Sequence, residues 1–231
     1  MKTIRVAIDG PAGAGKSTVA KQVAALLGME YIDTGAMYRA VTWAIIHENI
    51  PLDDEPQLRA FLASLRLVVE HDADGRQRVW VNGQEVSEQI RSPQVTEFVS
   101  VVAARPAVRE RLVDMQREIA RHKCVIMDGR DIGTVVFPDA EVKFFITASL
   151  DVRAMRRYQE LVARGHEIDY ETVKQELHRR DELDQNRAHS PLKPAEDAII
   201  LDTSQMPLAE VVERVSETIR QAKRGEQSCI K

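Results

Sequence analysis

The sequence has few of the features that mark secreted, membrane or nucleic-acid-binding proteins. It holds two cysteines, Cys124 and Cys229, which form neither a metal-ligand spacing nor a disulfide framework. No apolar run reaches the roughly 18 residues of a membrane-spanning helix, and the early run Val6–Ile8 is too short for a signal-peptide core. The formal net charge of -4 argues against a nucleic-acid partner. These absences predict a globular protein of the reducing cytoplasm with no nucleic-acid or membrane partner.

One stretch, GPAGAGKS from Gly10 to Ser17, has the spacing G-x-x-x-x-G-K-[ST] of a phosphate-binding loop. The apolar run 4–8 precedes it and a helical apolar pattern over 18–27 follows, so strand, loop and helix come in the required order. Glycines let backbone N–H groups approach phosphate oxygens, and the helix N-terminus attracts anions. In this motif Lys16 contacts the outer phosphates and the Ser17 hydroxyl can ligate Mg²⁺. The loop predicts a nucleoside triphosphate and leaves the reaction open.

The chain then alternates between predicted strands and helices. A strand over 29–32 leads into Asp33-Thr34-Gly35, and we expect Thr34 to cap the next helix. Arg39 follows near the first turn, where spacing alone leaves open a solvated side chain or a ligand-binding residue at the mouth of a parallel sheet. Residues 78–86 predict a β-hairpin, since Asn-Gly suits a two-residue turn. We therefore expect a small inserted antiparallel subdomain.

An acidic residue ends the next predicted strand. The apolar run 124–127 leads into Asp128, a pattern typical of the acid that organises Mg²⁺ in enzymes with a phosphate-binding loop. The charged segment Gly129-Arg130-Asp131 follows at the carboxyl end of this strand, where ligands bind in open α/β sheets. We expect these side chains to contribute to a site.

Two arginine clusters lie in later predicted helices. The first cluster holds three arginines in five residues, 153–157. In the second, Arg180, Asp184 and Arg187 stand at i, i+4 and i+7 and share one helix face. This face is either a surface ion-pair ladder or a binding site for a phosphorylated ligand with hydroxyl groups. The chemistry allows the second interpretation, because arginine bonds phosphate bidentately and a carboxylate accepts hydrogen bonds from hydroxyls.

Together, five motifs resemble those of the bacterial cytidylate kinase family of nucleoside-monophosphate kinases. They are IDGPAGAGKST at 8–18, DTGAMYR at 33–39, RPAVRERL at 105–112, DGRDIGTVVFPDA at 128–140 and RRDELDQNRAHSPL at 179–192. The resemblance covers nearly the whole chain, from Ile4 to about Ala222. It implies transfer of the terminal phosphoryl group of ATP, with Mg²⁺, to CMP or dCMP, which gives CDP or dCDP and ADP.

The same resemblance assigns roles to residues. Those that would hold the ATP phosphates are Gly10, Pro11, Ala12, Gly13, Ala14, Gly15, Lys16, Ser17 and Thr18. Those that would bind the acceptor are Thr34, Gly35, Tyr38, Arg39, Ser100, Arg109, Arg130, Asp131, Arg180, Asp184 and Arg187. Within this set, the resemblance places Ser100, Arg109 and Asp131 at the cytosine. The residues expected to stabilise the transferring group are Lys16, Arg130, Arg153, Arg157 and Arg187. Ser17 and Asp128 would hold the metal, directly or through water.

The expected fold is α/β: a five-stranded parallel sheet with helices on both faces, an inserted antiparallel-sheet subdomain and a lid. We expect one kinase unit over 1–231. Its core would comprise about 1–58, 96–150 and 196–222, with a base-binding insertion over about 59–95 and a lid over about 153–194. A monomer is expected, since no long apolar stripe is left unassigned.

Other functions fit the sequence less well. A GTP-binding switch needs an N-K-x-D box, which this sequence lacks. An RNA-binding ATPase is disfavoured by the acidic balance. A phosphate-loop kinase for another small acceptor, such as UMP or shikimate, remains the alternative, although the inserted sheet and paired arginine clusters favour a nucleotide.

Overall fold

The computed structural model describes residues 3–72 and 77–222. The chain forms two compact units, one of Met1–Tyr31 with Ala120–Lys231 and the other of Ile32–Ile119. The predicted base-binding insertion falls within the second unit, and the predicted lid falls within the first.

A five-stranded sheet organises the first unit, with the strand order β2-β6-β1-β7-β8. The strands are β1 (Arg5–Asp9), β2 (Glu30–Asp33), β6 (Val125–Gly129), β7 (Val142–Thr147) and β8 (Ile199–Asp202). β1 pairs in parallel with both β6 and β7, so Asp9, its last residue, lies in the middle of the carboxyl edge. The predicted α/β fold with a five-stranded parallel sheet is confirmed.

Two helices cover one face of this sheet. They are α1 (Lys16–Leu27) and α8 (Leu208–Ala222), which contact each other. Alternate side chains of the strands, such as Val6, Ile8 and Phe144, join them in one buried apolar cluster. This packing fixes the start of α1, and with it the phosphate-binding loop, at the carboxyl edge of the sheet.

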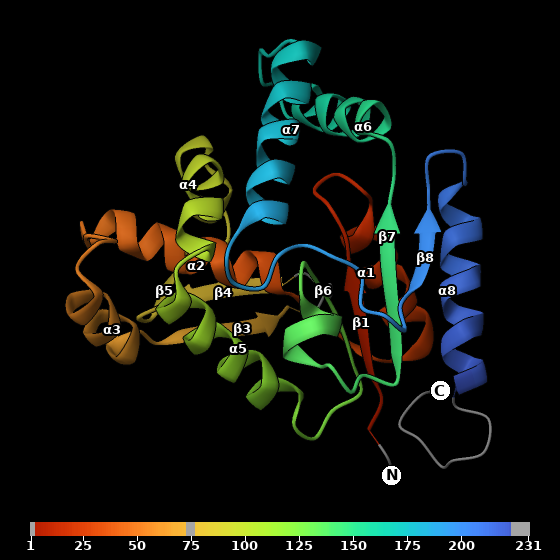
Figure 1. The fold of residues 1–231 in the computed structure, drawn as a ribbon, viewed down its shortest axis with the longest axis horizontal. Helices are drawn as coiled ribbons and strands as arrows, with labels where there is room; N and C mark the ends of the chain where they lie inside the picture. Colours follow the sequence, from red (N-terminus) through yellow and green to blue (C-terminus); the bar gives the residue numbers. More distant parts are fainter. Residues whose placement is uncertain (1–2, 73–76, 223–231) are drawn as a thin grey trace. The chain divides into compact units, whose positions relative to one another are not determined.

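A separate pair of helices follows the carboxyl end of β7 (Figure 1). The pair consists of α6 (Leu150–Ala163) and α7 (Tyr170–Asn186). It has its own small apolar cluster of Ala154, Val173 and Leu177, which also includes Ala12 of the phosphate-binding loop. Between β6 and β7 the chain makes a single π-helical turn over Ile132–Val136, which the sequence did not predict.

The second unit combines helices with a small antiparallel sheet. Its helices are α2 (Thr34–His47), α3 (Glu55–Ser64), a 3₁₀ turn (Gln89–Arg91), α4 (Pro93–Ala103) and α5 (Pro106–Ala120). Its strands are β3 (Leu67–His71), β4 (Gln77–Val81) and β5 (Gln84–Glu85), in the order β3-β4-β5. The predicted small antiparallel sheet is confirmed.

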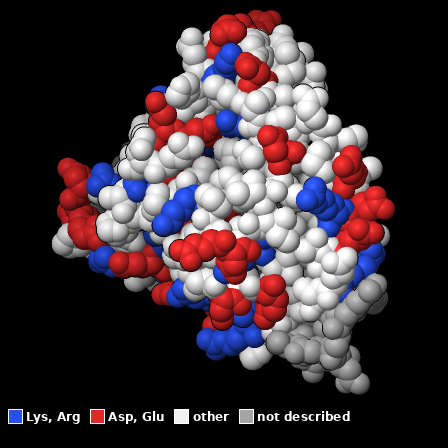
Figure 2. Space-filling view, turned by 45° about the vertical axis from the view of Figure 1, so that its right-hand side comes forward, with Lys and Arg blue, Asp and Glu red and all other residues white. Residues whose placement is uncertain are grey.

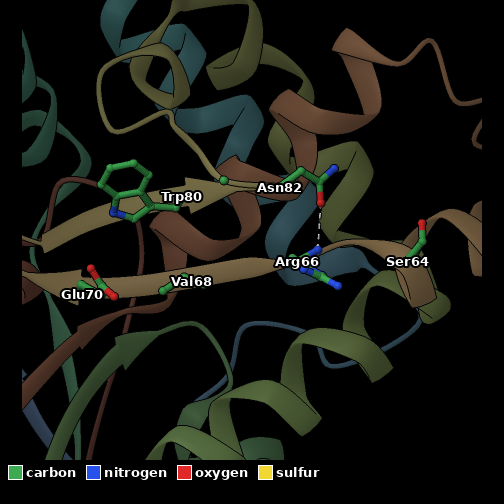
Figure 3. Close-up of a pocket in the computed structure, with 7 residues that line it drawn as sticks. Ser64, Arg66, Val68, Glu70, Trp80 and Asn82 are labelled. Atoms are coloured by element: carbon green, nitrogen blue, oxygen red, sulfur yellow. Dashed lines mark hydrogen bonds between the residues drawn. The ribbon is translucent and has the colours of Figure 1, made fainter.

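The predicted Asn-Gly turn joins β4 to β5. Asn82 and Gly83 have positive φ angles of 49° and 85°, as a primed two-residue turn requires. The Asn82 side chain also accepts a hydrogen bond from the Arg66 backbone N–H at 3.0 Å, which ties the turn to the start of β3 (Figure 3). The turn therefore fixes the register of all three strands.

Three local expectations differ from the structure. Asp33, and not Thr34, caps α2, because its carboxylate accepts from the Ala36 N–H at 2.9 Å and Thr34 is already helical. Helix α3, Glu55–Ser64, was not predicted from the sequence. Cys124 is buried and disulfide-bonded, whereas the sequence predicted no disulfide framework. Cys229 lies outside the described residues.

Charged side chains of both signs are interspersed on the face shown in Figure 2. Among the described residues, no helix combines the length and the apolar character needed to cross a bilayer.

Candidate active site

The phosphate-binding loop connects β1 to α1 at the carboxyl edge of the sheet. Gly10 has a φ of 145°, and a Cβ atom there would come within 1.9 Å of the Ile146 carbonyl oxygen on β7. Only glycine therefore permits this approach of the loop to the sheet. Lys16 is buried, and its Nζ donates to the Pro11 carbonyl at 2.7 Å, so the ammonium group curls back over the loop.

Burial and neighbouring charges shift the pKa of Lys16. Burial, and then the Arg130 guanidinium, lower the pKa of Lys16 to about 7, although the Asp128 and Asp9 carboxylates oppose the shift. A buried ammonium group surrounded in this way gains from an added anion. The loop thus presents a desolvated cation where the motif predicts phosphates.

Asp128 meets Ser17 at the base of the loop. The Ser17 hydroxyl donates to Asp128 Oδ2 at 2.7 Å, and the Tyr31 hydroxyl donates to Asp128 Oδ1 at 2.7 Å. A hydroxyl and a carboxylate are oxygen ligands of the kind that Mg²⁺ uses. No group of three or more acidic, histidine or cysteine side chains that could hold a metal occurs among the described residues. This donor set fits an ion that takes its remaining ligands from substrate phosphates and water.

Four charged residues form a buried cluster beyond β6. Arg130 Nε lies 2.8 Å from Asp184 Oδ2 on α7, and Arg187 Nη2 lies 3.9 Å from Asp131 Oδ1. Burial raises the pKa of Asp184, but the Arg130 and Arg180 charges outweigh it and hold the pKa below its usual value. The structure thus brings Arg130, Asp131, Asp184 and Arg187 together, with Arg180 as a fifth charge acting on Asp184.

Arg153 and Arg157 contact partners outside this cluster. Arg153 is buried and bonds to the Ala148 and Ala12 carbonyls and to Asp181, so it anchors the helix pair to the loop. Arg157 is partly exposed and pairs with Glu160 on its own helix at 2.8 Å, so the structure does not bring it to the cluster.

Four contacts near the loop could not be predicted from the sequence. Arg156 donates to the Thr203 carbonyl at 2.7 Å and to the Ala14 carbonyl of the loop at 3.5 Å. Tyr31 bonds to Asp128, and Asp181 pairs with Arg153. Each contact joins segments far apart in the chain, which spacing within one segment cannot reveal.

The second unit holds the other predicted acceptor residues. Arg39 Nη2 lies 3.4 Å from Asp33 Oδ2 at the start of α2, and its buried Nε atom has no hydrogen-bond partner among the described residues. The Arg109 guanidinium lies 5.4 Å from the Tyr38 ring centroid and donates to the Ala103 carbonyl. Thr34 and Gly35 form the first turn of α2, and Ser100 lies on α4.

A pocket of about 630 Å³ opens on the small sheet of the second unit (Figure 3). Its lining residues are Ser64, Arg66, Val68, Glu70, Trp80, Asn82 and Gly83. None of the predicted site residues is among them, so this pocket does not coincide with the predicted site.

Comparison with known proteins adds a second line of evidence. The sequence profile of a family described as Cytidylate kinase matches residues 6–221. A cytidylate kinase of Caldanaerobacter subterraneus subsp. tengcongensis is 54% identical over 224 residues, which cover 97% of this chain and 98% of that protein. A cytidylate kinase of a Geobacillus species is 50% identical over 218 residues, which cover 94% of this chain and 97% of that protein.

Among solved structures, an uncharacterized protein from Eubacterium ventriosum is similar with a TM-score of 0.51 and 12% identity. The alignment covers 94% of this chain and 99% of that one. At this identity the likeness concerns the fold alone.

Proposed function

Since the chain belongs to the cytidylate kinase family, we propose that it transfers the terminal phosphoryl group of ATP to CMP or dCMP. The products are ADP and CDP or dCDP. The observation that carries the proposal is the family match over 6–221, which includes both the phosphate-binding loop and the buried cluster around Arg130.

Positioning and charge neutralisation do most of the catalytic work in phosphoryl transfer. The loop from Gly10 to Thr18 binds the ATP phosphates, and Lys16 neutralises charge on the outer ones. Arg130 and Arg187 stabilise the group in transfer, because both guanidinium groups already lie in the buried cluster. No general base is needed, since the attacking atom is an oxygen of a phosphate.

The family assigns the acceptor to residues of the two motifs that begin at Asp33 and Asp128 and to residues near them in function. Thr34, Gly35, Tyr38 and Arg39 bind the CMP phosphate together with Arg130 and Arg187. The buried Nε of Arg39, which lacks a hydrogen-bond partner in the described part of the chain, supports an anion at that position. Ser100, Arg109 and Asp131 read the cytosine, and Arg180 and Asp184 bind the ribose. Arg153 supports the site by anchoring α6 and α7, and the exposed Arg157 reaches the phosphates only if the helix pair moves.

Mg²⁺ neutralises phosphate charge when it is bound with ATP, and Ser17 and Asp128 are the residues that would hold it, directly or through water. We expect Asp128→Asn to raise the free Mg²⁺ concentration for half-maximal rate about tenfold, because the amide carries no charge. Ser17→Ala should shift it in the same direction. Activity measured against free Mg²⁺ at saturating ATP and CMP tests this.

The matched control for the metal site is Asp139→Asn, an exposed carboxylate of the same unit that pairs with Arg5. This control should keep the wild-type magnesium requirement. An unchanged requirement in both Asp128→Asn and Ser17→Ala would remove these two residues from the metal site.

The helix pair α6–α7 is proposed as a lid over about 153–194. Its arginines would repel one another in the absence of an anion, but acidic partners offset that repulsion in the structure. Arg153 pairs with Asp181 and Arg157 pairs with Glu160, each within 2.8 Å. The lid can still move as a body, because its small apolar cluster is separate from the core under α1 and α8.

We expect amide hydrogen exchange in 153–191 to slow when CMP and a non-transferable ATP analogue bind together. Closure excludes water, which otherwise competes with CMP as acceptor. The helix α8 provides the internal reference, since it lies outside the site and should change little. Equal protection of 153–191 with and without ligands would contradict a lid.

The reaction itself is tested with a panel of acceptors. Release of ADP from ATP is measured with CMP, dCMP, UMP, AMP and shikimate at equal concentrations. CMP and dCMP should give the highest kcat/KM. A preference for UMP or shikimate would support the alternative, a kinase for a different small acceptor.

A further inference from the structure

Asp9 is a buried carboxylate to which the reaction above assigns no role. It is the last residue of β1 and directly precedes Gly10, the first residue of the phosphate-binding loop. Its side chain is 3% exposed, yet both oxygens are used. Oδ1 accepts from the Ile132 N–H at 2.8 Å, and Oδ2 accepts from the Gly133 N–H at 2.7 Å.

These two N–H groups open the π-helical turn Ile132–Val136. The first N–H groups of any helical turn lack partners within it. Asp131 occupies the capping position, but its side chain makes no capping hydrogen bond. Asp9, at the end of β1, therefore caps the turn. The Asp131 carboxylate does not serve as the cap. Isolated π-helical turns are rare and frequently occur at functional sites.

The turn is also confined from the opposite side. A Cβ atom at Gly133 would lie 3.2 Å from Lys143 Cδ and 3.4 Å from Asp9 Oδ2. Lys143 cannot easily retreat, because its Nζ bonds to the Pro138 carbonyl and to Asp197, the latter at 2.8 Å. The backbone at Gly133 is thus held between Asp9 and Lys143.

We propose that Asp9 is a positioning residue for the acceptor base. By holding the first two N–H groups of the turn, it fixes the backbone from which Asp131 projects. It does so next to Gly10, so the base-reading carboxylate and the phosphate-binding loop share one rigid support. This inference rests on the proposed function, in which Asp131 reads the cytosine amino group.

The test compares kcat/KM for CMP and for UMP in wild type and in Asp9→Asn. Burial raises the pKa of Asp9 to about 7, although its bonds to Gly133 and Ile132 oppose this, so assays are run at pH 8, where it is ionised. Asparagine offers one acceptor oxygen and turns an NH₂ group toward the second N–H, so one bond is lost. We expect the CMP/UMP ratio to fall roughly tenfold, because a small displacement of a positioned group has a large effect.

A second variant approaches the same contact from the turn. Gly133→Ala keeps Asp9 but inserts a methyl group between its carboxylate and the tethered Lys143. The CMP/UMP ratio should fall here as well. If Asp9→Asn fails to fold, the CMP/UMP ratio of Gly133→Ala tests the proposal instead.

A double variant shows whether Asp9 acts through Asp131. In an Asp131→Ala background, Asp9→Asn should leave the CMP/UMP ratio unchanged, because the group that it positions is gone. The control is Asp54→Ala, which removes a cap on α3, where Asp54 accepts from the Gln57 N–H at 3.0 Å. It should lower thermal stability without altering the ratio.

The outcomes separate this inference from the proposed function. A wild-type enzyme inactive on CMP would contradict the proposed function itself. A wild-type enzyme selective for CMP, with an unchanged CMP/UMP ratio in the folded Asp9→Asn and Gly133→Ala variants, would overturn the role of Asp9 alone. Equal losses on CMP and UMP would do the same, since they indicate a purely structural residue.

Discussion

Replacing Lys16 with alanine should abolish turnover while the protein stays folded. Lys16 is the only cationic side chain of the phosphate-binding loop, and in our proposal its buried ammonium group neutralises charge on the outer phosphates. Folding should tolerate the change, because burial already disfavours the charged form and lowers the pKa of Lys16 to about 7. Turnover is measured by release of ADP in the presence of CMP, and folding by thermal unfolding.

The control for this variant is Lys123→Ala, which removes an exposed lysine paired with Glu30. It should retain wild-type turnover. If Lys16→Ala kept more than about a tenth of the wild-type rate, a loss under roughly 1.4 kcal/mol in activation free energy, the assignment of the loop would be wrong.

Selectivity for cytosine over uracil should depend on Asp131. Cytosine carries an amino donor at position 4 and an acceptor at the ring nitrogen, whereas uracil has a carbonyl and an N–H there. Asp131 accepts from the amino group in our proposal, and Arg109 donates to the ring nitrogen. UMP would leave both groups facing the wrong partner, at about 1–3 kcal/mol for each unpaired group. We therefore expect wild-type kcat/KM to favour CMP by roughly a hundredfold or more.

Asp131→Ala should lower kcat/KM for CMP much more than for UMP and so narrow this gap. Arg130→Ala is the matched control, because it alters the adjacent residue and, in our proposal, removes a contact to the phosphate that both acceptors share. It should lower both values equally. The same equal loss in Asp131→Ala would make Asp131 a phosphate-site or structural residue.

Local patterns predicted the parts of the fold that depend on neighbours in the sequence. The phosphate-binding loop, the parallel strands and the Asn82-Gly83 turn each combine a residue type with a backbone requirement, and the structure contains all three. Arg180 and Asp184 share one face of α7, as their helical spacing predicted, but the prediction is wrong for Arg187, which follows the last helical residue and has an extended backbone.

Other features could not be predicted because they depend on long-range contacts or on close competition between neighbours. Asp33 and Thr34 are both good capping residues, and only the observed bond from the Ala36 N–H decides between them. The pairing of Arg153 with Asp181, and the cap that Asp9 provides to the turn at Ile132, join segments that share no local pattern. Helix α3 was missed because its polar N-terminus, with a proline in the first turn, resembles a loop.

The transfer of phosphoryl from ATP to a cytosine nucleotide can be measured directly by competition. Limiting ATP labelled in its terminal phosphate is mixed with equal concentrations of CMP and UMP and the wild-type enzyme, and the labelled products are separated by chromatography. We expect nearly all transferred label in CDP, and none in any product with Lys16→Ala. Label found chiefly in UDP or in free phosphate would contradict a cytidylate kinase reaction.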